Sequence, residues 1–225
     1  MNDLNRKAFG GLFRMALFLS VLVFLPAWTV FYWQGWICLA LFLACATGIT
    51  LYLIQNDPKL LERRMSAGAS AEKEASQKII QVFAAMAFVA MFVASALDHR
   101  FGWSVVPTYV VIAGDTLIVL GFLFIFFVFK ANSFTSGIIE IAPEQKVIST
   151  GPYGLVRHPM YLGALVMLLG IPLALDSWWG ELTLVPMTMV ILWRLMDEEI
   201  FLAENLPGYA EYRQKVRYRL VPFAW

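Results

Sequence analysis

The chain has 225 residues, of which 60% are hydrophobic and only 15% are charged. Soluble domains carry roughly 45–50% apolar and about 25% charged residues, so this composition excludes an ordinary soluble globular domain. The net charge is +1 and the basic residues are dispersed along the chain, which argues against nucleic acid as a partner.

Long apolar segments occupy much of the chain. The first four cover residues 12–31, 35–54, 79–97 and 108–129. About 20 residues at 1.5 Å per residue cross a ~30 Å hydrocarbon core, so each of these segments predicts a transmembrane helix. Two shorter segments, 160–175 and 182–196, are interrupted by Pro172 and Pro186, and we expect them to form a helical hairpin. The sequence therefore predicts an all-α integral membrane protein with about six transmembrane helices.

The basic residues predict how these helices are oriented. With the N-terminus in the cytoplasm, every lysine and arginine except Arg100 lies at or beside a cytoplasmic helix end. Aromatic residues such as Trp28, Trp103 and Trp178 flank the opposite ends, as is typical of a membrane interface. The first apolar segment ends in bulky residues without a cleavage site, which favours a retained helix over a signal peptide. We therefore expect both termini in the cytoplasm, and the inner membrane if the organism is a bacterium.

The polar segment 55–78 separates the second and third apolar segments. Asp57-Pro58 is typical of a capped helix start, and we expect a short helix that continues through Arg64. The basic side chains of this segment are suited to anionic headgroups, so membrane lipids are expected partners.

Residues 130–158 form the longest stretch outside the apolar segments. Breakers such as Gly137 and Pro143 exclude a continuous helix, whereas the interleaved isoleucines allow ordered packing. Long loops of this kind are commonly functional. We expect a four-helix transmembrane region over 1–129 and a cofactor-binding region over 130–225. In the second region, the 130–158 loop and the C-terminal tail would form a cytoplasmic cap.

Two polar clusters lie in the C-terminal region. The first is a turn followed by Arg157-His158, after which Pro159 starts a helix whose free N–H groups can bind an anion. The second contains Arg194 and Glu198, four residues apart on one helix face. Each cluster alone has a structural explanation, an interfacial anchor or a helix-stabilising pair. Because a hairpin returns both clusters to the same membrane face, together they favour a functional site.

Other residues with metal-binding or catalytic chemistry are few. His99 and His158 are the only histidines, and the orientation places them on opposite faces. Cys38 and Cys45 share a helix face about 10 Å apart, too far to bridge each other. No metal site is expected. Asp115 lies in the middle of the fourth apolar segment, where a functional and a structural interpretation both remain open.

Residues 130–225 resemble the isoprenylcysteine carboxyl methyltransferases and their prokaryotic relatives. The shared markers are Arg157-His158-Pro159-Met160-Tyr161, Glu198-Glu199 and the tail Tyr209, Tyr212, Val216, Arg219 and Pro222. The resemblance implies a multispanning bundle whose C-terminal half encloses S-adenosyl-L-methionine under a cytoplasmic cap. It also implies that Arg194 faces the methyl acceptor. The residues that it implies for cofactor binding are Gln145, Lys146, Val147, Ile148, Tyr153, His158, Pro159, Met160, Tyr161 and Glu198.

The resemblance implies an S-adenosylmethionine-dependent methyltransferase that is similar to carboxyl O-methyltransferases. Its acceptor would be amphipathic or lipid-like and would carry a carboxylate, a thiol or an amine. A carboxylate is ionised at pH 7 and needs a positioned cation, which Arg194 can supply through a bidentate contact. A membrane reductase of the sterol-reductase type, using NADPH, is one alternative. A non-enzymatic membrane protein is another, and binding of the two cofactors distinguishes among these functions.

Overall fold

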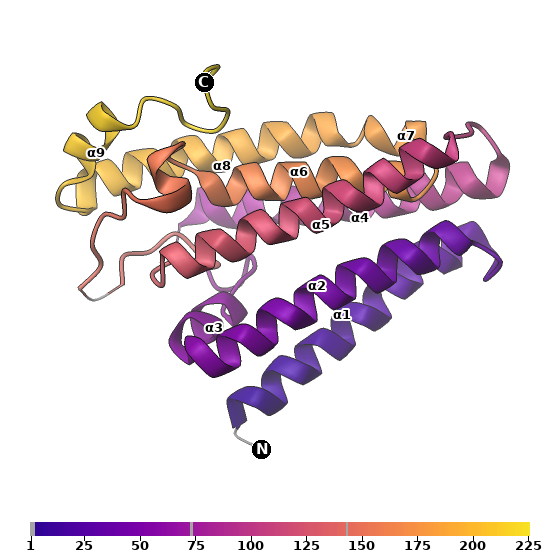
Figure 1. Cartoon of the computed structure of the whole chain (residues 1–225), viewed down its shortest axis with the longest axis horizontal. Coiled ribbons are helices and arrows are strands. Elements are labelled where there is room, and N and C mark those ends of the chain that lie inside the picture. Colours follow the sequence, from indigo (N-terminus) through magenta and orange to yellow (C-terminus); the bar gives the residue numbers. More distant parts are fainter. Residues whose placement is uncertain (1–2, 73, 143) are drawn as a thin grey trace.

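The computed structural model describes residues 3–72, 74–142 and 144–225, and every regular element within them is helical (Figure 1). Lys73 and Pro143, which the sequence patterns above include, lie outside the described residues. The α-helices are α1 Asp3–Ala27, α2 Trp33–Asn56, α3 Pro58–Met65, α4 Ala75–Phe101, α5 Thr108–Ala131, α6 Pro159–Ala174, α7 Trp178–Glu181, α8 Leu184–Asn205 and α9 Tyr209–Lys215. A 3-10 helix, η1, covers Gly151–Gly154.

The predicted all-α membrane fold is confirmed. By length and composition, α1, α2, α4 and α5 can each cross a membrane, and α6 is a shorter apolar helix. The sixth apolar segment forms the first part of α8, whose second part carries charged residues from Arg194 onward. Pro172 lies within α6, which ends two residues later at Ala174.

Helix α3 directly follows α2 and contacts the loop that follows α5. As predicted, Asp57 caps it, since its carboxylate accepts from the backbone N–H of Leu60 at 3.0 Å. Leu60 and Leu61 are buried against α1, α2 and α5, which fixes one face of the helix. From the same face, which Arg64 shares at i+4 from Leu60 and i+3 from Leu61, the Arg64 guanidinium donates to the carbonyl of Ser136 at 2.5 Å. The short helix therefore connects the transmembrane bundle to the cap.

Helices α5 and α6 approach closely because glycines line their contact. A Cβ on Gly121 would lie 2.6 Å from the backbone nitrogen of Met167, and one on Gly170 would lie 2.4 Å from the carbonyl oxygen of Gly114. Such distances leave no room for any side chain at these positions. The close contact fixes the start of α6, and with it His158, relative to α5.

Replacing Gly170 by alanine is expected to destabilise the bundle by roughly 1–3 kcal/mol, because the new methyl group would press on helix backbone that cannot rotate away. Thermal unfolding of the detergent-purified protein measures the effect. Gly48→Ala in α2 is the matched control, since a Cβ there meets no atom within 4 Å. Equal melting temperatures for the two variants would contradict this account of the α5–α6 contact.

The two ends of the bundle differ in chemistry. Figure 1 shows α3 and α9 at one end, and the α1–α2 connection, the α4–α5 connection and α7 at the other. At the second end Trp28, Trp103 and Trp178 are exposed, as a membrane interface requires. The cytoplasmic location of the first end stays a prediction from the basic residues.

Candidate functional site

A cavity of about 840 Å³ opens at the end of the bundle that carries α3 and α9. Its volume lies within the range of small-molecule sites, roughly 300–1,000 Å³. All of the residues that the sequence assigned to cofactor or acceptor binding line it. They are Gln145, Lys146, Val147, Ile148, Tyr153, His158, Pro159, Met160, Tyr161, Arg194 and Glu198.

One wall of the cavity is apolar and comes from the transmembrane helices. Phe42 and Ala46 of α2, Phe122 of α5 and Met167 of α6 line this part. Polar residues of the cap and of α8 line another part, so one cavity joins a hydrocarbon-like region to a charged region. Residues from both regions expected from the sequence, 1–129 and 130–225, line this cavity.

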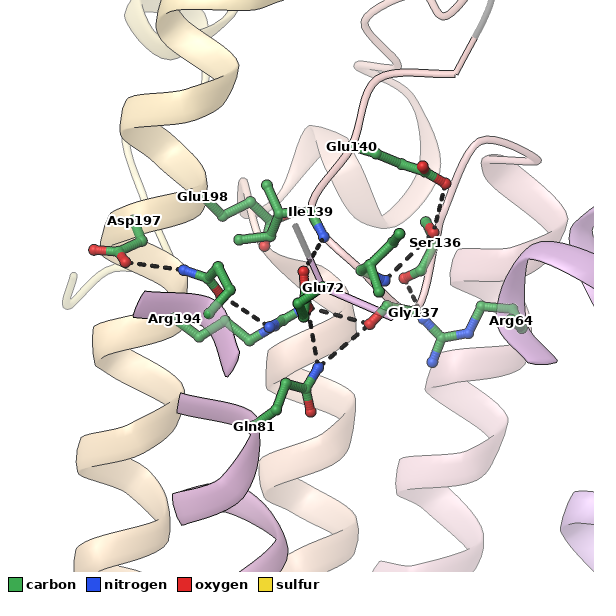
Figure 2. Close-up of polar contacts among 12 residues, drawn as sticks. Arg64, Glu72, Gln81, Ser136, Gly137, Ile139, Glu140, Arg194, Asp197 and Glu198 are labelled. Atoms are coloured by element: carbon green, nitrogen blue, oxygen red, sulfur yellow. Dashed lines mark hydrogen bonds and ion pairs between the residues drawn. The ribbon is translucent and has the colours of Figure 1, made fainter. Parts of the chain in front are cut away.

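The cap loop is held over the cavity by residues of the segment before α4 (Figure 2). The backbone N–H of Ile139 donates to the carboxylate of Glu72 at 3.3 Å. Gly137 touches Ala67 so closely that a Cβ at position 137 would lie 2.5 Å from the Ala67 Cβ. Together with the Arg64 contact to Ser136, these contacts order the loop from residue 136 to residue 139.

The Arg194 guanidinium lies at the boundary between the cavity and this loop (Figure 2). Its Nη2 forms an ion pair with Glu72 Oε1 at 2.8 Å and donates to the carbonyl of Gly137 at 3.2 Å. Its Nη1 donates to the side-chain oxygen of Gln77 at 2.9 Å. The arginine side chain is only 13% exposed. Its direction is therefore set by three acceptors, one each from the α3–α4 loop, α4 and the cap loop.

This geometry argues against the helix-stabilising pair, which the sequence left open as an alternative, and limits the contact that Arg194 can offer an acceptor. Its carboxylate partner is Glu72, whereas the Glu198 carboxylate accepts from the Tyr161 hydroxyl at 2.6 Å. The described contacts of Arg194 and Glu198 are therefore with other residues, and not with each other as an i,i+4 pair along α8. The expected bidentate contact is also not free, because both two-nitrogen edges of a guanidinium include Nη2. In this arrangement Nη2 already donates to Glu72 and Gly137, so Arg194 can offer an acceptor only single N–H contacts.

His158 and Glu198 lie together at the start of α6, although 40 positions separate them. The His158 Nδ1 atom is 3.9 Å from Glu198 Oε2, and the imidazole stacks near the Tyr161 ring with centroids 5.8 Å apart. The His158 side chain does not cap α6, and Pro159 occupies its first position. Met160 and Tyr161 of this first turn line the cavity, and backbone N–H groups at a helix start have no intrahelical acceptor, which suits an anionic group.

Glu199 is a buried carboxylate behind this turn. Its oxygens accept from Arg157 Nε at 2.5 Å and from Arg219 Nε at 3.0 Å, and His158 Nε2 lies 3.4 Å away. Burial by itself would raise the pKa of Glu199, but contacts with His158 and Arg157 outweigh it and lower the pKa to about 2. Arg157 also donates to the carbonyls of Val216 and Arg217. Arg157 therefore binds the tail to the turn that carries His158.

Reasoning from the sequence assigned no site role to Glu72 or Glu199. Glu199 belongs to the Glu198-Glu199 marker, so its position was visible but its role was not. Glu72 lies in a polar loop with Glu62 and Glu74 nearby, and nothing in the local sequence distinguishes it from them. Asp115, by contrast, is not among the residues that line the cavity.

Comparison with known proteins finds similarity to one curated protein and to one protein family. A mouse (Mus musculus) Delta(14)-sterol reductase is 30% identical over 90 residues, a match that covers 39% of this chain and 22% of the reductase. Residues 109–207, from α5 through α8, match the phospholipid methyltransferase family. The predicted resemblance to integral-membrane methyltransferases of the isoprenylcysteine carboxyl methyltransferase type is therefore confirmed over residues 109–207.

Proposed function

We propose that this protein is an integral-membrane methyltransferase that uses S-adenosyl-L-methionine to methylate an amphipathic, lipid-like acceptor. The main support is the cavity itself. It combines an apolar wall between transmembrane helices with the polar residues of the region that matches the methyltransferase family.

The residues present fit the proposed cofactor. The first turn of α6 offers N–H groups for a carboxylate, and Glu198 offers acceptor oxygens for hydroxyl or amino groups. His158 Nδ1 lies 3.9 Å from Glu198 Oε2, whereas Nε2 lies 3.4 Å from the buried Glu199, so Nδ1 is the imidazole atom beside these acceptor oxygens. Val147, Ile148 and Tyr153 add apolar and aromatic surface for a ring system. The cofactor, when bound, supplies a methyl group activated by a sulfonium.

The acceptor would lie in the other part of the cavity. A hydrocarbon chain fits along Phe42, Ala46, Phe122 and Met167, and the reactive group would then meet Arg194. Because Glu72 compensates the arginine charge, Arg194 would orient the nucleophile by directed N–H donors more than by net charge. Alignment of the nucleophile with the methyl group is the main contribution that an enzyme makes to an in-line displacement.

A membrane reductase that uses NADPH is the second candidate, since the similarity to Delta(14)-sterol reductase favours it. That similarity covers 22% of the reductase, so most of the reductase has no counterpart in the match. Titration calorimetry of the detergent-purified protein distinguishes the two. We expect binding of S-adenosylhomocysteine and no binding of NADPH. The reverse result would assign the cavity to a reductase, and binding of neither compound would favour a non-enzymatic protein.

Replacing His158 or Glu198 by alanine is expected to weaken S-adenosylhomocysteine binding by about 10- to 150-fold. The loss of one charged hydrogen bond costs roughly 1.5–3 kcal/mol, which corresponds to this range. Glu204→Ala, on the exposed face of α8, is the control and should bind as the unchanged protein does. Unchanged affinity in both folded variants would remove these residues from the cofactor site.

The acceptor class can be tested with two amphiphiles. N-acetyl-S-farnesylcysteine presents a carboxylate, and phosphatidylethanolamine in mixed micelles presents an amine. Transfer of a labelled methyl group from S-adenosylmethionine to either probe supports the proposed function and identifies the nucleophile. Transfer to neither probe would contradict an amphipathic acceptor of these two classes.

A further inference from the structure

Glu72 is the centre of a buried polar network that joins four segments of the chain (Figure 2). Its side chain is 1% exposed, and it belongs to the loop between α3 and α4. Oε1 binds Arg194 and accepts from Gln81 of α4 at 3.2 Å, whereas Oε2 accepts from the backbone N–H of Ile139 in the cap. A single carboxylate thus contacts α8, α4 and the cap loop at once.

The contacts around Glu72 determine the direction of the Arg194 side chain. The Gln77 amide is itself oriented, because its nitrogen donates to Asp197 at 2.9 Å and its oxygen therefore faces Arg194. Gln81 also donates to the Gly137 carbonyl that Arg194 contacts. The guanidinium is held from two sides by groups that are fixed by further partners. Only its remaining N–H groups are left for the cavity that Arg194 lines.

A buried ion pair of this kind is weak evidence that its role is to stabilise the fold. Desolvation of the two charges commonly offsets their attraction, so apolar residues of similar size would stabilise the fold as well or better. The pair has a definite geometric effect, however, because it fixes a side chain that would otherwise have many rotamers. Fixing a group that faces a reacting centre is a recognised requirement for catalysis.

We infer that Glu72 is a positioning residue, which aligns Arg194 toward the methyl acceptor and links this alignment to the position of the cap loop through Ile139. The inference rests on the proposed methyltransferase function and deepens it. Glu72, Gln77 and Gln81 lie outside residues 109–207, so the N-terminal half of the chain completes the site of the family-matched half.

The test compares Glu72→Gln with Glu74→Gln in the full-length protein. The Glu72→Gln variant would keep much of the side-chain shape but lose the charge, so methyl transfer to the two amphiphile probes should fall by about 10-fold or more. S-adenosylhomocysteine affinity should change little. The melting temperature should fall, because the buried Arg194 charge loses its partner, so the rates are compared well below the melting temperature of both variants. Glu74 is an exposed neighbour without a side-chain capping bond, and its variant should transfer methyl groups at the unchanged rate.

A second comparison separates positioning from a merely structural role. In an Arg194→Lys background the planar guanidinium is gone, so adding Glu72→Gln should cost less than about threefold. Gln81→Met, which loosens Glu72 without removing it, gives a milder variant in case Glu72→Gln does not fold. It should lower the rate by about 2- to 10-fold, again only while Arg194 is present.

The outcomes are distinct. If Glu72→Gln and Gln81→Met match Glu74→Gln in rate, the positioning role is wrong while the proposed function stands. The same conclusion follows if each lowers the rate equally in the unchanged protein and in the Arg194→Lys background. Loss of S-adenosylhomocysteine binding in Glu72→Gln would also overturn the role, because Glu72 would then act on the cofactor region. An unchanged protein that neither binds S-adenosylhomocysteine nor methylates either probe removes the proposed function and this inference with it.

Discussion

Arg194→Lys is expected to lower methyl transfer by at least about 10-fold while S-adenosylhomocysteine binding stays within about twofold. The reason is the arrangement of acceptors around the guanidinium, where Glu72, Gln77 and Gly137 lie in different directions. A planar arginine reaches all three from two nitrogens, whereas the single ammonium of lysine cannot. One well-aligned interaction in the transition state is worth about 1.4 kcal/mol or more, which corresponds to the 10-fold loss.

Two measurements make this result specific. Arg213→Lys, on an exposed position of α9, is the matched control and should leave the transfer rate unchanged. Cofactor affinity should persist because residues 145–148, the start of α6 and Glu198 are all unaltered. Full activity of Arg194→Lys would show that positive charge near the cap is sufficient and that guanidinium geometry has no role.

The features of the fold that depend on local sequence were predictable. A run of about 20 apolar residues specifies a transmembrane helix wherever it occurs, so the α1, α2, α4 and α5 segments were visible without tertiary information. The start of α3 was equally local, because Asp57 and Pro58 provide a cap and a first-turn residue by themselves. The convergence of His158 and Glu198 follows from the antiparallel course of α6 and α8, which brings the start of one and the second half of the other to the same end of the bundle.

The parts that depend on contacts between distant segments were not predictable. The spacing of Arg194 and Glu198 predicts an i,i+4 pair, but such a pair is worth only about 0.2–0.5 kcal/mol. A nearly buried arginine gains more from a carboxylate that is itself shielded from water, and the α3–α4 loop supplies Glu72 at 2.8 Å. Glu198 is then available to Tyr161. The close contact between α5 and α6 was likewise not predictable, because it depends on glycines in both helices. Within one helix, a glycine only lowers the local helix propensity.

Glu199→Gln is expected to be the most destabilising substitution in the cap region, by about 3–5 kcal/mol. Breaking a buried ion pair from one side leaves an uncompensated charge, and the Arg157 side chain is only 7% exposed. Two backbone hydrogen bonds join the same turn to the tail. The N–H groups of Arg157 and His158 donate to the carbonyls of Tyr218 and Arg219, respectively, at 2.9 Å each. We therefore expect a lower melting temperature together with weaker S-adenosylhomocysteine binding, because His158 loses its support. Glu204→Gln on the same helix should have neither effect.

The pH dependence of unfolding gives an independent test of the same carboxylate. The folded protein lowers the pKa of Glu199 from its ordinary 4.5 to about 2, so the ionised form is favoured in the folded state. Its contribution is complete above pH 4.5 and is lost as the pH falls from there toward 2. The full difference corresponds to roughly 3 kcal/mol. The melting temperature of the unchanged protein should therefore fall across this window by more than that of Glu199→Gln, which has no carboxylate to titrate at this position. Equal decreases of the melting temperature in the two proteins would show that titration of Glu199 does not cause the loss of stability in acid. The tail would then be held by other contacts.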